Sequence, residues 1–121
     1  MKVLGVDFGT KRIGLAWSDT TLGMVLPYGI VKNIKELANL IEAEGVEQIV
    51  VGWPVSANGS ENKNTILVKE FAYELSKLTT VPMVFSDERF SSQAADAAGG
   101  SISRDEAAAM IILEGYLGRK R

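Results

Sequence analysis

The strongest constraint on this chain is an apolar run near its N-terminus that contains a single carboxylate. The segment Val3–Phe8 is predicted to be a β-strand, in which side chains alternate between two faces. Burying a carboxylate in such a strand costs free energy unless a cation or hydrogen-bond donors compensate it. We therefore expect Asp7 to be held by a metal ion, a basic side chain or backbone N–H groups, and we interpret it as a metal ligand.

The residue types that are missing limit the kinds of catalytic and metal-binding site that this chain can form. The 121 residues suit one domain, predicted to span 1–121, and they include neither His nor Cys. Thiolate sites, His-based triads and the usual zinc sites are therefore excluded. Oxygen ligands remain, and these favour Mg²⁺ or Mn²⁺ as the cofactor.

Charge and hydropathy say less about partners. The formal net charge is −2, and residues 33–62 carry five Glu against one Lys. No apolar stretch is long enough to cross a bilayer, and no signal peptide precedes the first strand. We therefore expect a cytoplasmic protein that does not bind membranes, as a monomer or a weak homodimer.

Three strands are predicted in succession at the start of the chain. Ile13–Ser18 follows Val3–Phe8 after the short polar turn Gly9–Arg12, which indicates a hairpin. Val25–Val31 is a third strand, and Pro27 places it at an edge or a bulge. The first part of the chain therefore predicts an antiparallel meander.

The second part alternates between helical and strand patterns. Two further strands are predicted at Gln48–Gly52 and Pro82–Ser86. Three long helices are predicted, each after a capping residue; the capping residues are Asn33, Ser60 and Ser103. A short helix, Ser91–Ala98, is predicted before the last long helix. The second helix is expected to bury one apolar stripe; it consists of Leu67, Phe71, Leu75 and Leu78.

This order of elements predicts the fold class. Alternating helices and strands imply parallel strands joined by helical crossovers. An antiparallel meander joined to a parallel half is the arrangement of the ribonuclease H-like fold. We therefore predict an α/β protein with a mixed five-stranded sheet in the order 3-2-1-4-5 and helices on both faces.

Carboxylates follow the predicted strands at places that this fold brings together. Asp7, the pair Asp87-Glu88, and Asp105 in the first turn of the last helix are expected at one rim of the sheet, where α/β sites usually lie. Glu106, in the same first turn, is a candidate on the same grounds as Asp105. Clustered carboxylates repel one another, and divalent cations stabilise such clusters. Two metal ions can then promote phosphodiester hydrolysis.

Each candidate also has a structural interpretation. A carboxylate at position 105 stabilises the start of a helix through the helix dipole, by about 0.3–1 kcal/mol. Asp87-Glu88-Arg89 suits a polar strand exit with an internal ion pair. Lys11 and Arg12 are ordinary turn charges by default, but beside a carboxylate rim they become candidates to hold phosphates.

Four motifs, in order, resemble the YqgF family of bacterial resolvase-like nucleases, also called RuvX. The resemblance covers nearly the whole chain, and the four together are highly specific. The motifs are Val3–Ala16, Val51–Glu61, Asp87–Ser92 and Asp105–Leu117. Two serines stand at 91 and 92, where the family more usually has threonines. The segment before the last helix is shorter than the basic loop that family members often carry.

The resemblance implies a ribonuclease H-like fold and a divalent-metal nuclease site. Asp7, Glu88 and Asp105 match the acidic triad of the family, so we predict them as catalytic residues and metal ligands. Lys11, Arg12 and Arg89 are predicted to position phosphates. Because about 9–10 Å separates strands two places apart, Asp87 is held as a reserve for Glu88, although alternation turns it to the other face.

Function is then expected to concern nucleic acid. The family is associated with maturation of the 5′ end of 16S ribosomal RNA, so pre-16S rRNA and the small-subunit precursor are the expected partners. An older interpretation is a Holliday junction resolvase acting on branched DNA. Two alternatives stay open: an actin-like ATPase or sugar-kinase lobe, whose opening strand also ends as Asp7–Thr10 does, and a non-catalytic RNA-binding assembly factor.

Overall fold

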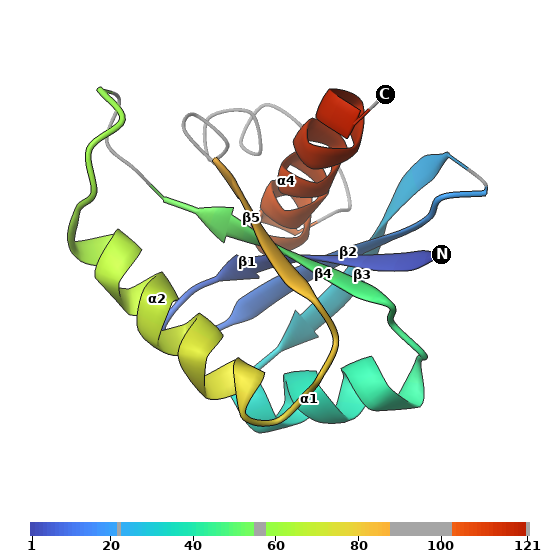
Figure 1. Cartoon of the computed structure of the whole chain (residues 1–121), viewed down its shortest axis with the longest axis horizontal. Coiled ribbons are helices and arrows are strands. Elements are labelled where there is room, and N and C mark those ends of the chain that lie inside the picture. Colours follow the sequence, from blue (N-terminus) through green and yellow to red (C-terminus); the bar gives the residue numbers. More distant parts are fainter. Residues whose placement is uncertain (22, 55–57, 88–102, 121) are drawn as a thin grey trace.

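A five-stranded sheet runs through the molecule, with α4 on one face and α1 and α2 on the other (Figure 1). The computed structural model describes residues 1–21, 23–54, 58–87 and 103–120. The strands are β1 (Lys2–Phe8), β2 (Ile13–Asp19), β3 (Met24–Val31), β4 (Gln48–Trp53) and β5 (Met83–Asp87). The helices are α1 (Ile34–Ala43), α2 (Lys63–Ser76) and α4 (Arg104–Lys120).

The topology of the sheet is the predicted one. Its strand order is β3-β2-β1-β4-β5. The pairs β1–β2 and β2–β3 are antiparallel, whereas β4 runs parallel to both β1 and β5. The meander, the parallel half and the helices on both faces are therefore confirmed, and β1 lies at the centre of the sheet.

Alternation along β1 divides the core into two layers. Leu4 and Val6 pack with the buried residues of α1 and α2. Val3 packs on the opposite face, in a cluster that includes Ala109 and Leu113 of α4. Asp7 shares the parity of Val3, so it lies on the face that α4 covers.

Two glycines allow α4 to approach the sheet closely. A Cβ added at Gly5 would lie 2.9 Å from both the carbonyl oxygen of Ala109 and the Cβ of Leu113. A Cβ added at Gly14 would lie 2.8 Å from the Cβ of Asp105, and closer still to its carbonyl oxygen. α4 therefore packs closely on the sheet, and this close packing depends on glycines in β1 and β2.

The helix starts are partly as predicted. Asn33 caps α1, because its Oδ1 accepts from the Glu36 N–H at 2.9 Å. Before α4, the Glu106 N–H donates to Ser103 Oγ at 3.2 Å, and that hydroxyl donates to Glu106 Oε1 at 2.8 Å. These two caps are confirmed. The predicted helix 91–98 lies outside the described residues.

Two predictions about α2 are wrong. The helix is capped by Asn62 and not by Ser60, whose hydroxyl instead donates to Asn58 Oδ1 at 2.7 Å. Leu78 lies beyond the last turn and is 56% exposed, so it does not extend the buried stripe. The buried residues of α2 are Thr65, Val68, Phe71, Ala72 and Leu75.

Replacing the cap of α2 tests this correction. Asn62→Ala is expected to reduce the free energy of unfolding by about 1 kcal/mol, because Asn62 Oδ1 accepts from the N–H groups of Asn64 and Thr65. Ser60→Ala is the matched control, with an expected change within about 0.5 kcal/mol. Denaturant unfolding measures both, and equal losses would show that Asn62 is not the dominant cap.

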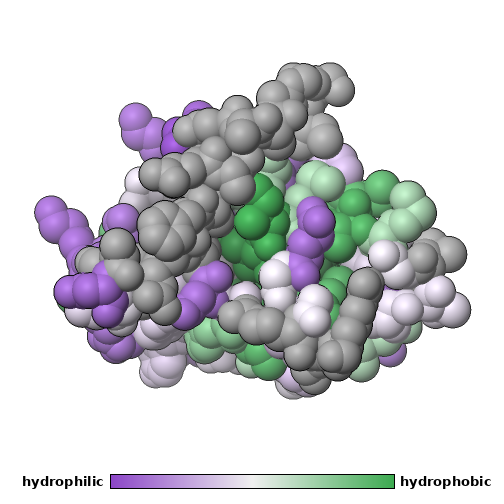
Figure 2. Space-filling model, turned by 90° about the horizontal axis from the view of Figure 1, so that it is seen from above, coloured by the Kyte–Doolittle hydropathy of each residue, from purple (hydrophilic) through white to green (hydrophobic). Residues whose placement is uncertain are grey.

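The outer surface is mixed in character. Figure 2 shows hydrophobic surface in the middle of the face seen from above and hydrophilic residues toward its left-hand edge. Several large apolar side chains remain exposed, among them Ile66, Leu78 and Phe85. Within the part of the chain that the structure describes, no helix has the length and hydrophobicity needed to cross a membrane.

Candidate active site

Asp7 lies near the carboxyl end of β1, with small residues beside it on the same face. Its Cα pairs with that of Gly14 on β2. On its other side, the register of β1 with β4 places Asp7 next to Gly52, which in turn pairs with Ser86 of β5. Neither glycine has a side chain to crowd the half-buried carboxylate.

The start of α4 brings Asp105 to the same place. Asp105 is the second residue of α4, and its backbone packs directly on Gly14, the cross-strand partner of Asp7. Paired Cα atoms in an antiparallel ladder are about 4.5–5.5 Å apart, so Asp7 and Asp105 are neighbours. The N-terminus of α4 also faces this rim, and its dipole favours negative charge there.

A guanidinium group accompanies the two carboxylates. Arg12 Nε donates to Asp105 Oδ2 at 2.7 Å, and the two side chains are 62% and 28% exposed. A positive charge at this position offsets repulsion between Asp7 and Asp105. Lys11, the adjacent residue of the β1–β2 turn, is exposed. The turn therefore places a basic side chain on Asp105. The phosphate-binding roles of Lys11 and Arg12 stay predictions.

Glu106 has a different role from Asp105. One carboxylate oxygen accepts from the Gly29 N–H at 2.7 Å, and the other accepts from the Ser103 hydroxyl at 2.8 Å. Gly29 has a φ of 101° and lies in β3 beside a register shift. Glu106 thus bonds α4 to an irregular part of the sheet. This bond distinguishes Glu106 from Asp105, although the sequence pattern fitted both residues equally.

The sequence did not single out two features of this site. They are the contact between Gly14 and Asp105 and the bond from Gly29 to Glu106. A glycine inside a predicted strand was the available signal, because it commonly marks a bulge or the close approach of another backbone.

The remaining predicted residues are not all placed. Glu88 and Arg89 lie outside the described residues, so their roles stay predictions. Asp87 pairs with Trp53 and shares its face with Phe85, whose ring centroid lies 4.9 Å from that of Trp53. That face is opposite to the one that carries Asp7, as alternation predicts. Across residues 1–21, 23–54, 58–87 and 103–120, no three acidic side chains are grouped in a way that would bind a metal ion.

A family model and individual related sequences match this chain over nearly its whole length. The family model of RuvX, described as "Holliday junction resolvase", matches residues 1–119. A protein of Carboxydothermus hydrogenoformans is 40% identical over 135 positions, covering 99% of this chain and 98% of its own length. A protein of Maridesulfovibrio salexigens is 40% identical over 134 positions, covering 98% of this chain and 99% of its own length. Both carry the name "Putative pre-16S rRNA nuclease".

Solved structures show the same fold at low sequence identity. RuvC of T. thermophilus, in complex with a Holliday junction substrate, matches with a TM-score of 0.62 and 14% identity, covering 98% of this chain and 96% of that one. The Fowlpox virus resolvase, in complex with Holliday junction DNA, matches with a TM-score of 0.56 and 13% identity, covering 99% and 97%. The predicted ribonuclease H-like fold class is confirmed.

Proposed function

Because this chain belongs to the RuvX family of resolvase-like nucleases, we propose that it is a divalent-metal-dependent nuclease that processes the 5′ end of pre-16S rRNA. One observation supports the proposal: Asp7 and Asp105, which come from opposite ends of the chain, both lie against Gly14 on one face of the sheet. The choice of RNA is supported by the names of the relatives, which are similar to this chain over nearly its whole length.

The donor set fits a hard divalent cation. Both placed candidates are carboxylates, and the chain has no His or Cys to favour a softer metal. Asp7 and Asp105, with Glu88 as the proposed third ligand, would hold Mg²⁺ or Mn²⁺. When bound, the cation would activate water and neutralise charge on the phosphodiester.

The basic residues would then act on the substrate. Arg12 reaches Asp105 from an exposed turn, so it is free to exchange this carboxylate for a substrate phosphate. Lys11 and the proposed Arg89 would add further phosphate contacts. The N-terminus of α4 would favour a phosphate at the same rim.

Cleavage assays on two nucleic acids test the proposal. The purified protein is incubated with a fragment spanning the 5′ precursor of 16S rRNA, and separately with a four-way DNA junction, in Mg²⁺, Mn²⁺ or EDTA. We expect metal-dependent cleavage of the RNA alone. Cleavage of the junction alone would support the resolvase function that the family description favours. Binding without cleavage of either would contradict the enzyme assignment and favour an assembly factor.

Removing the Arg12 guanidinium should weaken RNA binding with little effect on the stability of the fold. Arg12→Ala is expected to change the free energy of unfolding by less than about 1 kcal/mol, because the Arg12 side chain is 62% exposed. The same change should weaken RNA binding about fivefold and reduce the salt dependence of log Kobs by about 0.7. Lys69→Ala, which removes an exposed ion pair with Glu61, is the control. Equal effects of the two variants on binding would argue against a specific role for Arg12.

A further inference from the structure

A pocket of about 680 Å³ opens on the face of the sheet opposite to Asp7 and Asp105. Its apolar lining comes from β1, β2, the start of α1 and the residues after α2; these are Phe8, Ile13, Ile34 and Leu78. This volume lies in the range of pockets that bind small organic groups. Leu78, which is 56% exposed, leaves apolar surface open to solvent at this pocket.

The polar lining of the pocket is basic. Lys32, Lys35 and Lys77 contribute three ammonium groups, against the single carboxylate of Glu74. Glu74 is paired with Lys77 at 3.6 Å. Among the described residues, no ion pair engages Lys32 or Lys35. In a chain with a net charge of −2, this is a local excess of positive charge that suits an anionic ligand.

The β1–β2 turn joins this pocket to the candidate active site. Thr10 lines the pocket, while Arg12 of the same turn bonds to Asp105 on the far face. Phe8, in the pocket wall, directly follows Asp7. A nucleic acid strand that runs from the carboxylates across the turn would therefore reach the pocket within a short length of the strand.

We propose that this pocket binds an unpaired nucleotide of the RNA substrate, close in sequence to the phosphate that is cleaved. The base would lie against the apolar walls, and Lys32 and Lys35 would contact the adjoining phosphates. Single-stranded nucleic acid is commonly bound by this combination of apolar or aromatic surface and a basic groove. A base held in a duplex stack is not available to enter such a pocket. The inference rests on the proposed function and assigns a single-stranded segment to its substrate.

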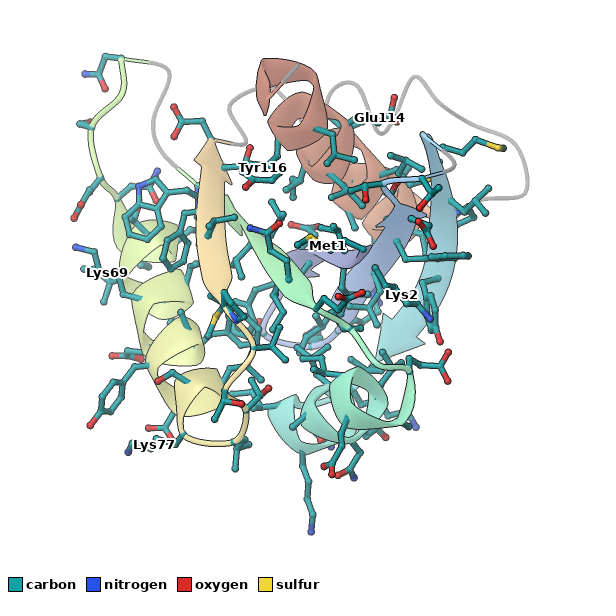
Figure 3. All side chains as sticks on the ribbon, turned by 45° about the vertical axis from the view of Figure 1, so that its right-hand side comes forward. Met1, Lys2, Lys69, Lys77, Glu114 and Tyr116 are labelled. Atoms are coloured by element: carbon teal, nitrogen blue, oxygen red, sulfur yellow. The ribbon has the colours of Figure 1, made fainter. Side chains whose placement is uncertain are left out.

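Lys69 of α2 and Lys77, the C-cap residue that follows α2, provide a closely matched pair for the test. Lys77 and Lys69 are about equally exposed, at 53% and 50%, and each is paired with a glutamate. Each ammonium also lies over an aromatic ring. Figure 3 shows Lys69 beside α2 and Lys77 near the C-terminal end of that helix. Of the two, Lys77 lines the pocket and Lys69 does not. Lys77→Ala and Lys69→Ala thus remove the same charge inside and outside the proposed site.

Fluorescence anisotropy with a labelled single-stranded RNA of about 12 nucleotides measures binding. The double variant Lys32→Ala/Lys35→Ala is expected to weaken binding about tenfold and to lower the salt slope by about 1.4, or about 0.7 for each lost phosphate contact. Lys77→Ala should weaken binding more than Lys69→Ala, and Lys32→Arg/Lys35→Arg should restore it. Equal effects of Lys77→Ala and Lys69→Ala would show non-specific attraction and overturn the proposal.

Cleavage kinetics separate this inference from the proposed function. For long single-stranded RNA, the double alanine variant should raise KM with little change in kcat, while a substrate too short to reach the pocket should show neither change. If the wild-type protein cleaves RNA but the double variant behaves identically on long RNA, the pocket assignment alone is wrong. If the wild-type protein neither binds nor cleaves RNA, the proposed function fails and the pocket assignment falls with it.

Discussion

Asp7→Asn is expected to lower the rate of RNA cleavage by about a thousandfold. A bound metal ion supplies several kcal/mol of transition-state stabilisation, which would be lost with its ligand, and about 4 kcal/mol corresponds to three powers of ten in rate. Asparagine preserves the shape of the side chain but removes the negative charge that the proposed cation needs. Single-turnover cleavage of the precursor fragment in Mg²⁺ and in Mn²⁺ measures the loss.

Folding should survive this substitution. Asp7 lies beside Asp105, so removing one charge relieves repulsion between them. We expect a Tm close to that of the wild type. Asp87→Asn is the matched control, because Asp87 ends β5 on the opposite face of the sheet; it should retain near wild-type cleavage. A large fall in the Tm of Asp7→Asn would identify Asp7 as structural, and equal loss of activity in Asp87→Asn would contradict the proposed ligand set.

The sheet was predictable because its signals are local and mutually consistent. Short apolar runs bounded by turn residues define the strands, and the short turn after Phe8 indicates a hairpin. Alternating helices and strands then require parallel crossovers. These signals place Asp7 near the carboxyl end of a central strand without any knowledge of side-chain contacts.

The start of α2 was not predictable from local pattern. Ser60 and Asn62 are both good capping residues, so propensity does not choose between them. Contacts of Thr65 with Asn62 and with Pro54 favour Asn62 as the capping residue. The Thr65 hydroxyl donates to the carbonyl of Pro54, and Thr65 Oγ1 accepts from the Asn62 N–H at 3.0 Å. A contact to the end of β4 cannot be derived from helix propensity.

The arrangement around Asp105 was likewise only partly predictable. Its position in the first turn of a buried helix follows from sequence, but Glu106 satisfies the same pattern. What separates them is their tertiary partners, which are Gly14 and Arg12 for Asp105 and Gly29 for Glu106. Each of these contacts joins residues far apart in the chain, and no local periodicity specifies them.

Gly14→Ala is expected to damage both stability and cleavage, because its Cβ would collide with the backbone of Asp105. Overpacking of this kind costs about 1–3 kcal/mol, and the first turn of α4 has to move to relieve it. A misplacement of a reacting group by about 1 Å can lower a rate about a hundredfold. Denaturant unfolding and cleavage per folded molecule measure the two effects.

Two other glycines make this test specific. Gly5→Ala would press on α4 further along the helix, at 2.9 Å from Ala109 and Leu113, so it should destabilise the fold while leaving more of the cleavage rate. Gly115→Ala, in an open part of α4, should stabilise the helix by up to about 1 kcal/mol. If Gly14→Ala and Gly5→Ala lose stability and cleavage in the same proportion, the contact between Gly14 and Asp105 has no particular role in positioning the carboxylate. If Gly14→Ala loses far more cleavage than its stability predicts, the glycine positions Asp105 against Asp7, and the packing of α4 is part of the active site.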